Sequence, residues 1–419
     1  MARITRRTFL KSAGVVGGAA AIAGFPHVNR LALGQSKPFK WGYVTPLTGP
    51  FATEAHDQKR GVEIAIEELN AAGGIVGRKM ELLVRDTEFN PATARRKAVE
   101  LLENEKVDIL AGPLTGAEQL VLNELGCKYN ILVANYPQNI VSYKKGLACK
   151  WFFGANTTPY QAAWSTGRYA AQHLGKKWHF LGDNYYWPQL IFRGIEKIAK
   201  DTGATIPPPT WAPFPATDYS QFIPKIQAAK PDVLFVSNFG APQVTFAKQA
   251  VEFGLKQQMK IVFPVTEITI AEAAGKGVFE GMHAGCLFYW TLKDKYPGAK
   301  QFFEKFQAKS PGRVPSGYAA AAYTTTRVIA DTANEIKSVD LQKLAAALEG
   351  RKFQYLKGPE QIRACDHTNL QQAFILKGKA AEAMKDKWDF FDIIGEVGPE
   401  AAEPCKDEGF DENVPLSKT

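Results

Sequence analysis

The feature that most constrains the fold is a regular alternation of short apolar strands and amphipathic helices, which begins at residue 39. Four strands are predicted in the first run, at 39–44, 80–85, 107–111 and 131–134. Helices are predicted between them at 57–70, 91–105 and 116–126, where apolar residues recur every three or four positions. Asn90 followed by Pro91 is a typical cap and first turn for the second helix.

The same rhythm starts again after residue 156. Strands are predicted at 178–182, 232–237, 260–263 and 282–290, and helices at 160–174, 189–202, 220–229, 242–254, 298–309, 316–336 and 339–349. The chain beyond 351 is expected to be irregular, with one strand at 372–376. Two successive strand-helix runs predict an α/β protein of two doubly wound, Rossmann-like lobes with parallel sheets.

The amino terminus has the features of an export signal. The segment from Thr5 to Lys11 places two arginines before an apolar pair and a lysine, and it resembles a twin-arginine leader. The apolar run from Ala13 to Gly24 is shorter than the ~20 residues that span a membrane. Small residues suited to a signal peptidase follow at Ala21, Ala23, Ala32 and Gly34. We therefore expect a signal peptide over residues 1–34 and a periplasmic localisation. The alternative is that the N-terminal segment is an ordinary basic arm.

Composition narrows the class of partner. The formal net charge is +9, part of which belongs to the leader. The remaining lysines and arginines form no run with interleaved aromatic residues, so a nucleic acid is not expected as a partner. A hydrophobic content of 45% is that of a globular chain with a substantial core.

The five cysteines fit an oxidising compartment, where two disulfides and one free thiol are expected. Spacing alone leaves the pairing open, and the most local options are Cys127 with Cys149 and Cys365 with Cys405. Cys286 lies in an apolar run, which favours a buried free thiol.

Motifs of catalysis are absent from the sequence. The six histidines show no metal-ligand spacing, and no Gly-x-Ser-x-Gly nucleophile motif occurs. The Gly73-Gly74-x-x-Gly77 cluster joins the end of a helix to a strand, which is the reverse of the phosphate-binding order. We interpret the chain as a binding protein without catalytic residues, metal or cofactor.

The candidate ligand site lies in the loops where strands end, since ligands of doubly wound sheets sit outside the carboxyl ends of the strands. In the first lobe these loops are 45–52, 112–117 and 135–139, which contain the candidates Thr115, Gly116, Ala117, Tyr136 and Gln138. A helix that begins at such a loop offers free N–H groups to an anion.

Three loops of the second lobe carry further candidates, which are Tyr185, Trp187, Asn238, Phe239 and Glu267. Their aromatic rings could stack on a ligand or pack the surface of the lobe.

These residues together resemble the leucine/isoleucine/valine-type solute-binding proteins of ABC transporters, over nearly all of the chain after the leader. The resemblance rests on Pro46-Leu47-Thr48-Gly49-Pro50, Gly61, the stretch from Asn70 to Lys79, Asn90 to Ala94, Gly112-Pro113, Glu280-Gly281-Met282, and Tyr318 with Tyr323.

The resemblance implies the type I periplasmic binding protein fold, in which two lobes close like a hinge around three crossings. It places these crossings near Asn156, Ala284 and Lys357. The first lobe is then 37–156 with 284–356, the second 157–283 with 357–395, and a C-terminal tail follows at 396–419.

The resemblance also assigns roles to single residues. Gly116, beside Thr115, aligns with the serine that holds the ligand carboxylate in amino-acid-binding members. Glu54 stands where the family has a tyrosine, and Trp187 aligns with the tyrosine of the second lobe. Glu267 is the available partner for a ligand amine. These departures make an aromatic or otherwise apolar carboxylate as good a candidate as a branched-chain amino acid.

The expected function is that of a monomeric receptor, which binds its solute between the lobes and delivers it to ABC permease subunits in the membrane. Two alternatives remain open on the sequence. One is an exported redox enzyme with a cofactor, as many proteins with this leader are, and the other is a ligand sensor of the same fold.

Overall fold

The computed structural model describes residues 37–137 and 146–419. The predicted leader at 1–34 and the candidate residue Gln138 lie outside the described residues. Within the described part of the chain, no helix combines the length and apolar character that crossing a membrane requires.

Residues 39–153 build a five-stranded parallel sheet in the order β2-β1-β3-β4-β5. Its strands are β1 (Phe39–Thr45), β2 (Met80–Asp86), β3 (Ile109–Gly112), β4 (Val133–Asn135) and β5 (Phe152–Phe153), connected through α1 (Ala52–Ala71), α2 (Pro91–Glu103) and α3 (Gly116–Tyr129). The side chain of Asn90 accepts hydrogen bonds from the N–H groups of Ala92 and Thr93, so the predicted cap of α2 is confirmed.

The second sheet has seven strands in the order β15-β14-β10-β9-β8-β6-β7. They are β6 (Trp178–Asp183), β7 (Thr210–Ala212), β8 (Val233–Ser237), β9 (Lys260–Phe263), β10 (His283–Cys286), β14 (Ala373–Gly378) and β15 (Phe391–Val397). Its helices are α4 (Pro159–His173), α5 (Tyr186–Thr202), α6 (Ile223–Ala229), α7 (Ala241–Glu252), α8 (Leu255–Gln258) and α9 (Ile268–Ala274).

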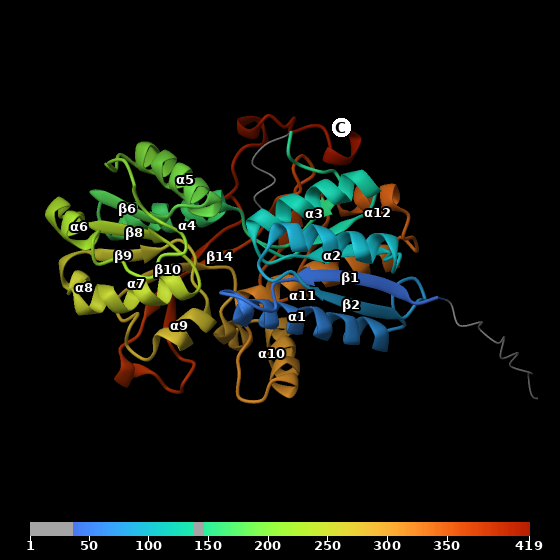
Figure 1. Cartoon of the computed structure of the whole chain (residues 1–419), viewed down its shortest axis with the longest axis horizontal. Coiled ribbons are helices and arrows are strands. Elements are labelled where there is room, and N and C mark those ends of the chain that lie inside the picture. Colours follow the sequence, from blue (N-terminus) through green and yellow to red (C-terminus); the bar gives the residue numbers. More distant parts are fainter. Residues whose placement is uncertain (1–36, 138–145) are drawn as a thin grey trace, which may run out of the picture. The chain divides into compact units, whose positions relative to one another are not determined.

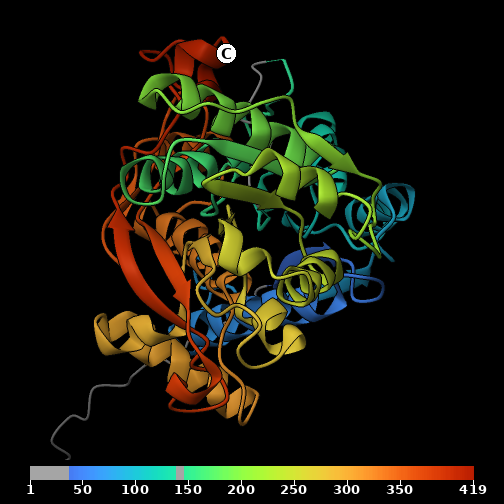
Figure 2. The same ribbon diagram turned by 90° about the vertical axis from the view of Figure 1, so that its left-hand side faces the viewer.

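β14 runs antiparallel to both of its neighbours, β10 and β15, and the long β14–β15 pair forms one edge of the sheet (Figure 2). The expectation of a single strand beyond residue 351 is wrong, because β15 and three short strands lie there besides β14. The expected strand at 282–290 is also too long, since β10 ends at Cys286 and a 3-10 turn, η2 (Trp290–Asp294), follows.

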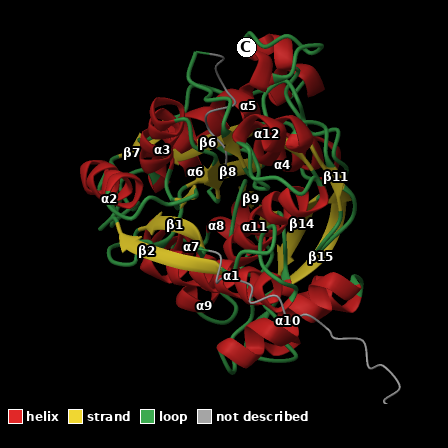
Figure 3. Ribbon diagram, turned by 90° about the vertical axis from the view of Figure 1, so that its right-hand side faces the viewer, coloured by secondary structure: helices red, strands yellow, loops and turns green. Residues whose placement is uncertain are grey.

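Helices α10 (Pro297–Lys309), α11 (Gly317–Glu335) and α12 (Leu341–Leu348) follow β10 and return to the first sheet. α2 and α3 cover one face of that sheet, and α1 and α11 cover the other (Figures 1 and 3). α11 packs so closely along α1 that a Cβ added to Gly61 would lie 2.1 Å from the carbonyl oxygen of Ala319. We call the first sheet with these helices the first lobe, and the second sheet with α4–α9 the second lobe.

A small antiparallel sheet of β11 (Lys352–Phe353), β12 (Glu360–Ile362) and β13 (Asn369–Leu370) precedes β14. The chain passes between the lobes after β5, after β10 and before β14. The predicted fold class, α/β with two doubly wound parallel sheets, is confirmed.

The cysteines are joined as Cys127–Cys149 and Cys365–Cys405, which are the two most local pairings. Cys286 is a buried free thiol, and burial raises its pKa. Asp366 lies near enough to Cys365 and Cys405 for the three to hold a metal, but the two sulfur atoms are bonded to each other.

The C-terminal tail (396–419) crosses from one lobe to the other. Arg193 and Lys197 of α5 form ion pairs with Glu408 and Asp407 of the tail. Farther along, the N–H and hydroxyl of Ser417 donate hydrogen bonds of 2.6 Å to the carboxylate of Glu349, at the end of α12. The tail thus contacts helices of both lobes.

Candidate ligand-binding site

A cavity of about 60 Å³ lies where loops of the two lobes meet. We call it the ligand cavity. The residues that line it are Phe51, Leu114, Thr115, Gly116, Pro137, Tyr185, Trp187, Phe239 and Tyr318. Most of them follow the carboxyl ends of β3, β4, β6 and β8, which is where a doubly wound sheet binds its ligands. Five of the predicted candidates, Thr115, Gly116, Tyr185, Trp187 and Phe239, belong to this set.

Aromatic rings join the lobes at this cavity. The ring of Phe51, from the first lobe, lies 5.9 Å from that of Phe239 of the second, and Phe239 lies 5.6 Å from Tyr318 of α11. Gly240 permits this approach, because a Cβ there would lie 2.7 Å from the Phe51 ring. Its φ of +65° is also a conformation that other residues rarely adopt.

The amino end of α3 forms one end of the cavity. Thr115 is the N-cap, but its hydroxyl donates a 2.7 Å hydrogen bond to the Glu118 carboxylate instead of capping the helix. The first N–H groups of α3, from Gly116 onward, have no acceptor within the helix and are available to an anion. Burial raises the pKa of Glu118, which reduces the negative charge at this turn.

The rest of the cavity is apolar with two hydroxyl groups. The Tyr185 and Tyr318 hydroxyls have no hydrogen-bond partner among the residues that the structure describes. None of the described residues that line the cavity carries an acidic or basic side chain. An electroneutral ring with one anionic group would therefore meet complementary chemistry throughout.

Glu54 and Glu267 do not line the ligand cavity. Glu54 borders a separate cavity of about 520 Å³ and accepts a 3.0 Å hydrogen bond from the hydroxyl of Thr269. Glu267 is buried, and its carboxylate accepts a 2.7 Å hydrogen bond from the N–H of Gly317. Burial, together with the charges of Glu54 and Asp57, raises the pKa of Glu267 to about 8.

Three other candidates lie away from the cavity walls. Tyr136 is in the core of the first lobe, where its hydroxyl accepts a 2.8 Å hydrogen bond from Trp41 and contacts Thr326. Asn238, which precedes Phe239 in the sequence, is buried, and its side-chain amide donates a hydrogen bond to the hydroxyl of Tyr219. Ala117 is exposed on α3.

Tyr219 links Asn238 to a buried acid. Its hydroxyl donates a 2.6 Å hydrogen bond to Asp183 at the end of β6, whose pKa is raised to about 7 by burial. This polar cluster supports the loops that carry Tyr185 and Phe239.

Sequence reasoning missed four residues of the cavity, namely Phe51, Leu114, Pro137 and Tyr318. The first three lie within the loops that were singled out, so the strand-exit rule could have found them. Tyr318 comes from α11, and the only feature of the sequence that singled it out was the family resemblance, which includes this residue.

Comparison with known proteins decides the family. Residues 38–383 match the profile of the periplasmic binding proteins, and residues 3–23 match the twin-arginine translocation signal sequence. The chain belongs to the periplasmic binding protein family. Members of this family are solute-binding receptors, and with its export signal this one works in the periplasm.

Three known proteins show the range of the family. A Leu/Ile/Val-binding protein homologue of Brucella abortus is 24% identical over 75% of this chain and 81% of its own. The structure of an amino acid ABC transporter substrate-binding protein from Pseudomonas fluorescens has a TM-score of 0.83, with 24% identity over 90% of this chain and 99% of its own. A solute-binding protein of Rhodopseudomonas palustris, in complex with 3,4-dihydroxybenzoic acid, has a TM-score of 0.77 and 20% identity over 86% and 98%.

Proposed function

We propose that this protein is the receptor of an ABC importer, that it binds a small aromatic carboxylate in the ligand cavity, and that it delivers this solute unchanged to permease subunits. The observation that carries the proposal is the lining of the cavity, in which aromatic side chains surround the amino end of α3 and none of the described residues carries a charged side chain.

The carboxylate fits the amino end of α3. The free N–H groups there donate hydrogen bonds to an anion, and the helix dipole favours its charge by ~0.3–1 kcal/mol or more. The side chains of Phe51, Trp187 and Phe239 then surround the ring of the solute, where pairs of aromatic rings add ~0.5–1.5 kcal/mol each beyond the area that they bury.

The absence of an acid among the described lining residues speaks against an α-amino acid. The ammonium of such a ligand needs a carboxylate partner, since an unpaired buried charge is costly. Glu267 is the nearest candidate from the sequence, but its carboxylate is turned toward Gly317 and the first turn of α11.

Binding also requires movement of the cavity walls. A cavity of about 150 Å³ holds benzene, whereas the ligand cavity measures about 60 Å³. Tyr185 and Trp187 are both partly exposed, so their side chains can turn toward solvent without disturbing the packing of the core. The solute therefore enters as the lobes part and is held when contacts from both lobes close on it.

A branched-chain amino acid is the second candidate, because the matched relatives of Brucella bear Leu/Ile/Val-binding names. It would need Glu267 or Glu54 to turn into the cavity and meet the ammonium group.

Titration calorimetry with benzoate, 3,4-dihydroxybenzoate, benzamide and leucine separates the candidates. We expect the two acids to bind and benzamide to bind at least roughly tenfold more weakly, since it lacks the charge that α3 favours. Binding of leucine without binding of either acid would refute the aromatic carboxylate.

Trp187→Ala should weaken binding of the best acid by roughly tenfold or more, because it removes an aromatic wall. Tyr186→Ala is the matched control, since Tyr186 is an exposed neighbour on the same helix and is not part of the lining. Equal losses in the two variants would remove Trp187 from the site.

Delivery to a permease is tested with the transporter subunits reconstituted in vesicles. The loaded receptor should stimulate their ATPase activity and import the acid unaltered, as checked by chromatography. Recovery of a modified solute would instead indicate an enzyme, and failure to stimulate any such transporter would favour a sensor.

A further inference from the structure

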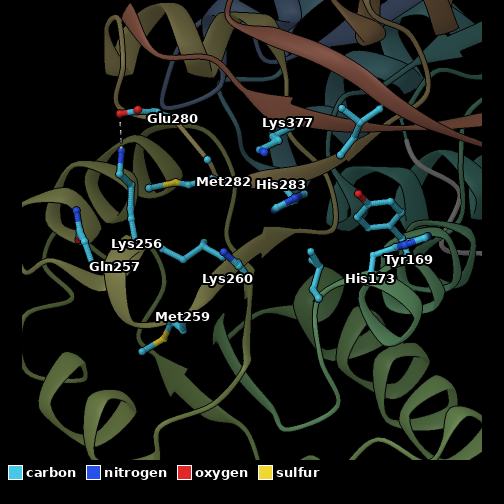
Figure 4. Close-up of a pocket in the computed structure, with 14 residues that line it drawn as sticks. Tyr169, His173, Lys256, Gln257, Met259, Lys260, Glu280, Met282, His283 and Lys377 are labelled. Carbon is cyan, nitrogen blue, oxygen red and sulfur yellow. Dashed lines mark hydrogen bonds and ion pairs between the residues drawn. The ribbon is translucent and has the colours of Figure 1, made fainter.

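A third and larger cavity, of about 600 Å³, lies in the second lobe (Figure 4). It is lined by the first residues of β9 and the residues that lead into β10, among them Lys260, Met282 and His283. The ligand cavity lies at the opposite, carboxyl ends of parallel strands of the same sheet. We call this space the basic cavity; nothing in the proposed function makes use of it.

Strand register brings three nitrogen-bearing side chains together in the basic cavity. His283 of β10 is paired across the sheet with Lys377 of β14 on one side and with Val262 of β9 on the other. Lys260 lies two residues before Val262, so its side chain is on the same face as that of His283. Figure 4 shows the His283 ring between the amines of Lys260 and Lys377.

Helix α4 closes this face with Tyr169 and His173. The ring of Tyr169 lies 5.9 Å from that of His283 and 4.6 Å from that of His173, and its hydroxyl points toward His283 in Figure 4. Met259, Met282, Leu174 and Ile394 add an apolar wall. The cavity thus combines an apolar wall with polar groups that converge on one point, as small-molecule sites do.

The positive charge of the basic cavity is only partly compensated. Lys256 is paired at 3.3 Å with Glu280, which is the only acid among the described lining residues. Asp392 lies opposite Lys377 on β15, but its carboxylate forms an ion pair with Lys379. Lys260 and Lys377 thus have no ion-pair or hydrogen-bond partner for their amines among the described residues.

His283 is only 5% exposed, and its Nδ1 atom has no hydrogen-bond partner in the described structure. Burial and the charges of Lys377 and Lys260 lower its pKa to about 4. The imidazole is therefore neutral at pH 7 and surrounded by positive charge, which an anion would relieve.

We propose that the basic cavity is a binding site for a soluble phosphate monoester, with Lys260 and Lys377 on either side of the phosphate and His283 facing it. A dianionic phosphate matches the two unpaired ammonium groups, which a monocarboxylate would not. The volume exceeds that of a phosphate ion, so the organic part of the ester packs against Met259, Met282 and Ile394. The site is independent of the proposed solute receptor function.

Titration calorimetry of the mature chain with phenyl phosphate at pH 7 tests the proposal, with inorganic phosphate as a second probe. The double variant Lys260→Gln with Lys377→Gln should lose roughly tenfold or more in affinity for phenyl phosphate, since two charge-assisted hydrogen bonds are removed. Lys200→Gln with Lys248→Gln is the matched control, because it makes the same change in net charge with exposed lysines outside the lining.

A second readout locates the ligand. Phenyl phosphate should shift the NMR signals of the His283 imidazole, assigned with His283→Gln, and should raise its pKa. Benzoate, which has the same ring with a single charge, should leave these signals unmoved.

Several results would overturn the proposal: no saturable binding at millimolar phenyl phosphate, equal affinity in the two double variants, or unchanged His283 signals. Retention on phosphatidic acid vesicles without binding of phenyl phosphate would also overturn it, because the partner would then be a membrane surface. Binding of benzoate at the ligand cavity is measured on the same variants, so failure of one site is distinguishable from failure of the other.

Discussion

Replacing Glu267 by glutamine should stabilise the protein at neutral pH and leave its stability almost unchanged in mild acid. Glu267 is the N-cap residue of α9, and it is buried against Gly317, the first residue of α11. Glutamine keeps an oxygen that can accept the hydrogen bond from the Gly317 N–H, but it cannot ionise.

The pKa of Glu267 gives the size and the sign of the effect. It rises from 4.5 to about 8 on folding, chiefly because the carboxyl is buried. Below pH 4.5 both states hold the proton, so the shift costs nothing. Between pH 4.5 and 8 only the unfolded state releases the proton, and stability falls as pH rises. The loss is about 1 kcal/mol at pH 5, about 4 at pH 7.5 and about 5 above pH 8.

Thermal unfolding of wild type and Glu267→Gln between pH 5 and 7.5 measures this difference. With an unfolding entropy of ~2.1 cal/mol/K per residue, the Tm of the variant should exceed that of wild type by ~1 °C at pH 5 and ~5 °C at pH 7.5. Glu54 and Asp57 are present in both proteins, so the difference isolates Glu267.

Glu304→Gln is the control, because Glu304 is an exposed acid of α10 and should give no gap at any pH. A gap for Glu267→Gln that does not change with pH, or a variant that is less stable at pH 7.5, would refute the reasoning.

Two glycine substitutions test the packing that positions the site. Gly61→Ala should destabilise the protein by about 1–3 kcal/mol in chemical unfolding, despite the better helix propensity of alanine, because the new Cβ meets the carbonyl of Ala319; unchanged stability would contradict this close contact. Gly240→Ala should drive Phe51 away and favour separated lobes, which small-angle X-ray scattering would detect as a larger radius of gyration, whereas identical scattering would show that the Phe51 contact does not hold the lobes.

The alternation of strands and helices was predictable because parallel strands covered on both faces are continuously apolar. β8 (Val233–Ser237), for example, is buried at every position. β15 escaped detection because it lies at the sheet edge, where exposed residues alternate with partly exposed ones and a register shift interrupts the pairing. Local pattern is weakest in such strands.

The candidate site was predictable only in part. Thr115, Gly116, Tyr185, Trp187 and Phe239 line the ligand cavity because each follows a strand, and chain direction alone places such loops together. Their contacts with a solute remain predictions.

The orientation of single side chains could not be predicted from the sequence. Glu267 stands in an expected loop and Glu54 in the first turn of α1, but the packing of α9 against the amino ends of α1 and α11 turns both away from the ligand cavity. Tyr318 reaches the cavity from a helix some 200 positions after Thr115, a proximity that only the return of α11 to the first lobe creates.

The C-terminal tail gives the protein a sensitivity to ionic strength. One part of the tail is held covalently, through Cys405 and Cys365, whereas its contacts with α5 are ion pairs of Arg193 and Lys197, whose side chains are 51% and 38% exposed. Such pairs weaken in salt, since the screening length falls from ~10 Å at 0.1 M to ~3 Å at 1 M. Concentrated salt should therefore release the tail from α5 of the second lobe, while the disulfide keeps the tail attached beside β12. The two lobes should then move relative to one another more freely at high ionic strength than at low ionic strength.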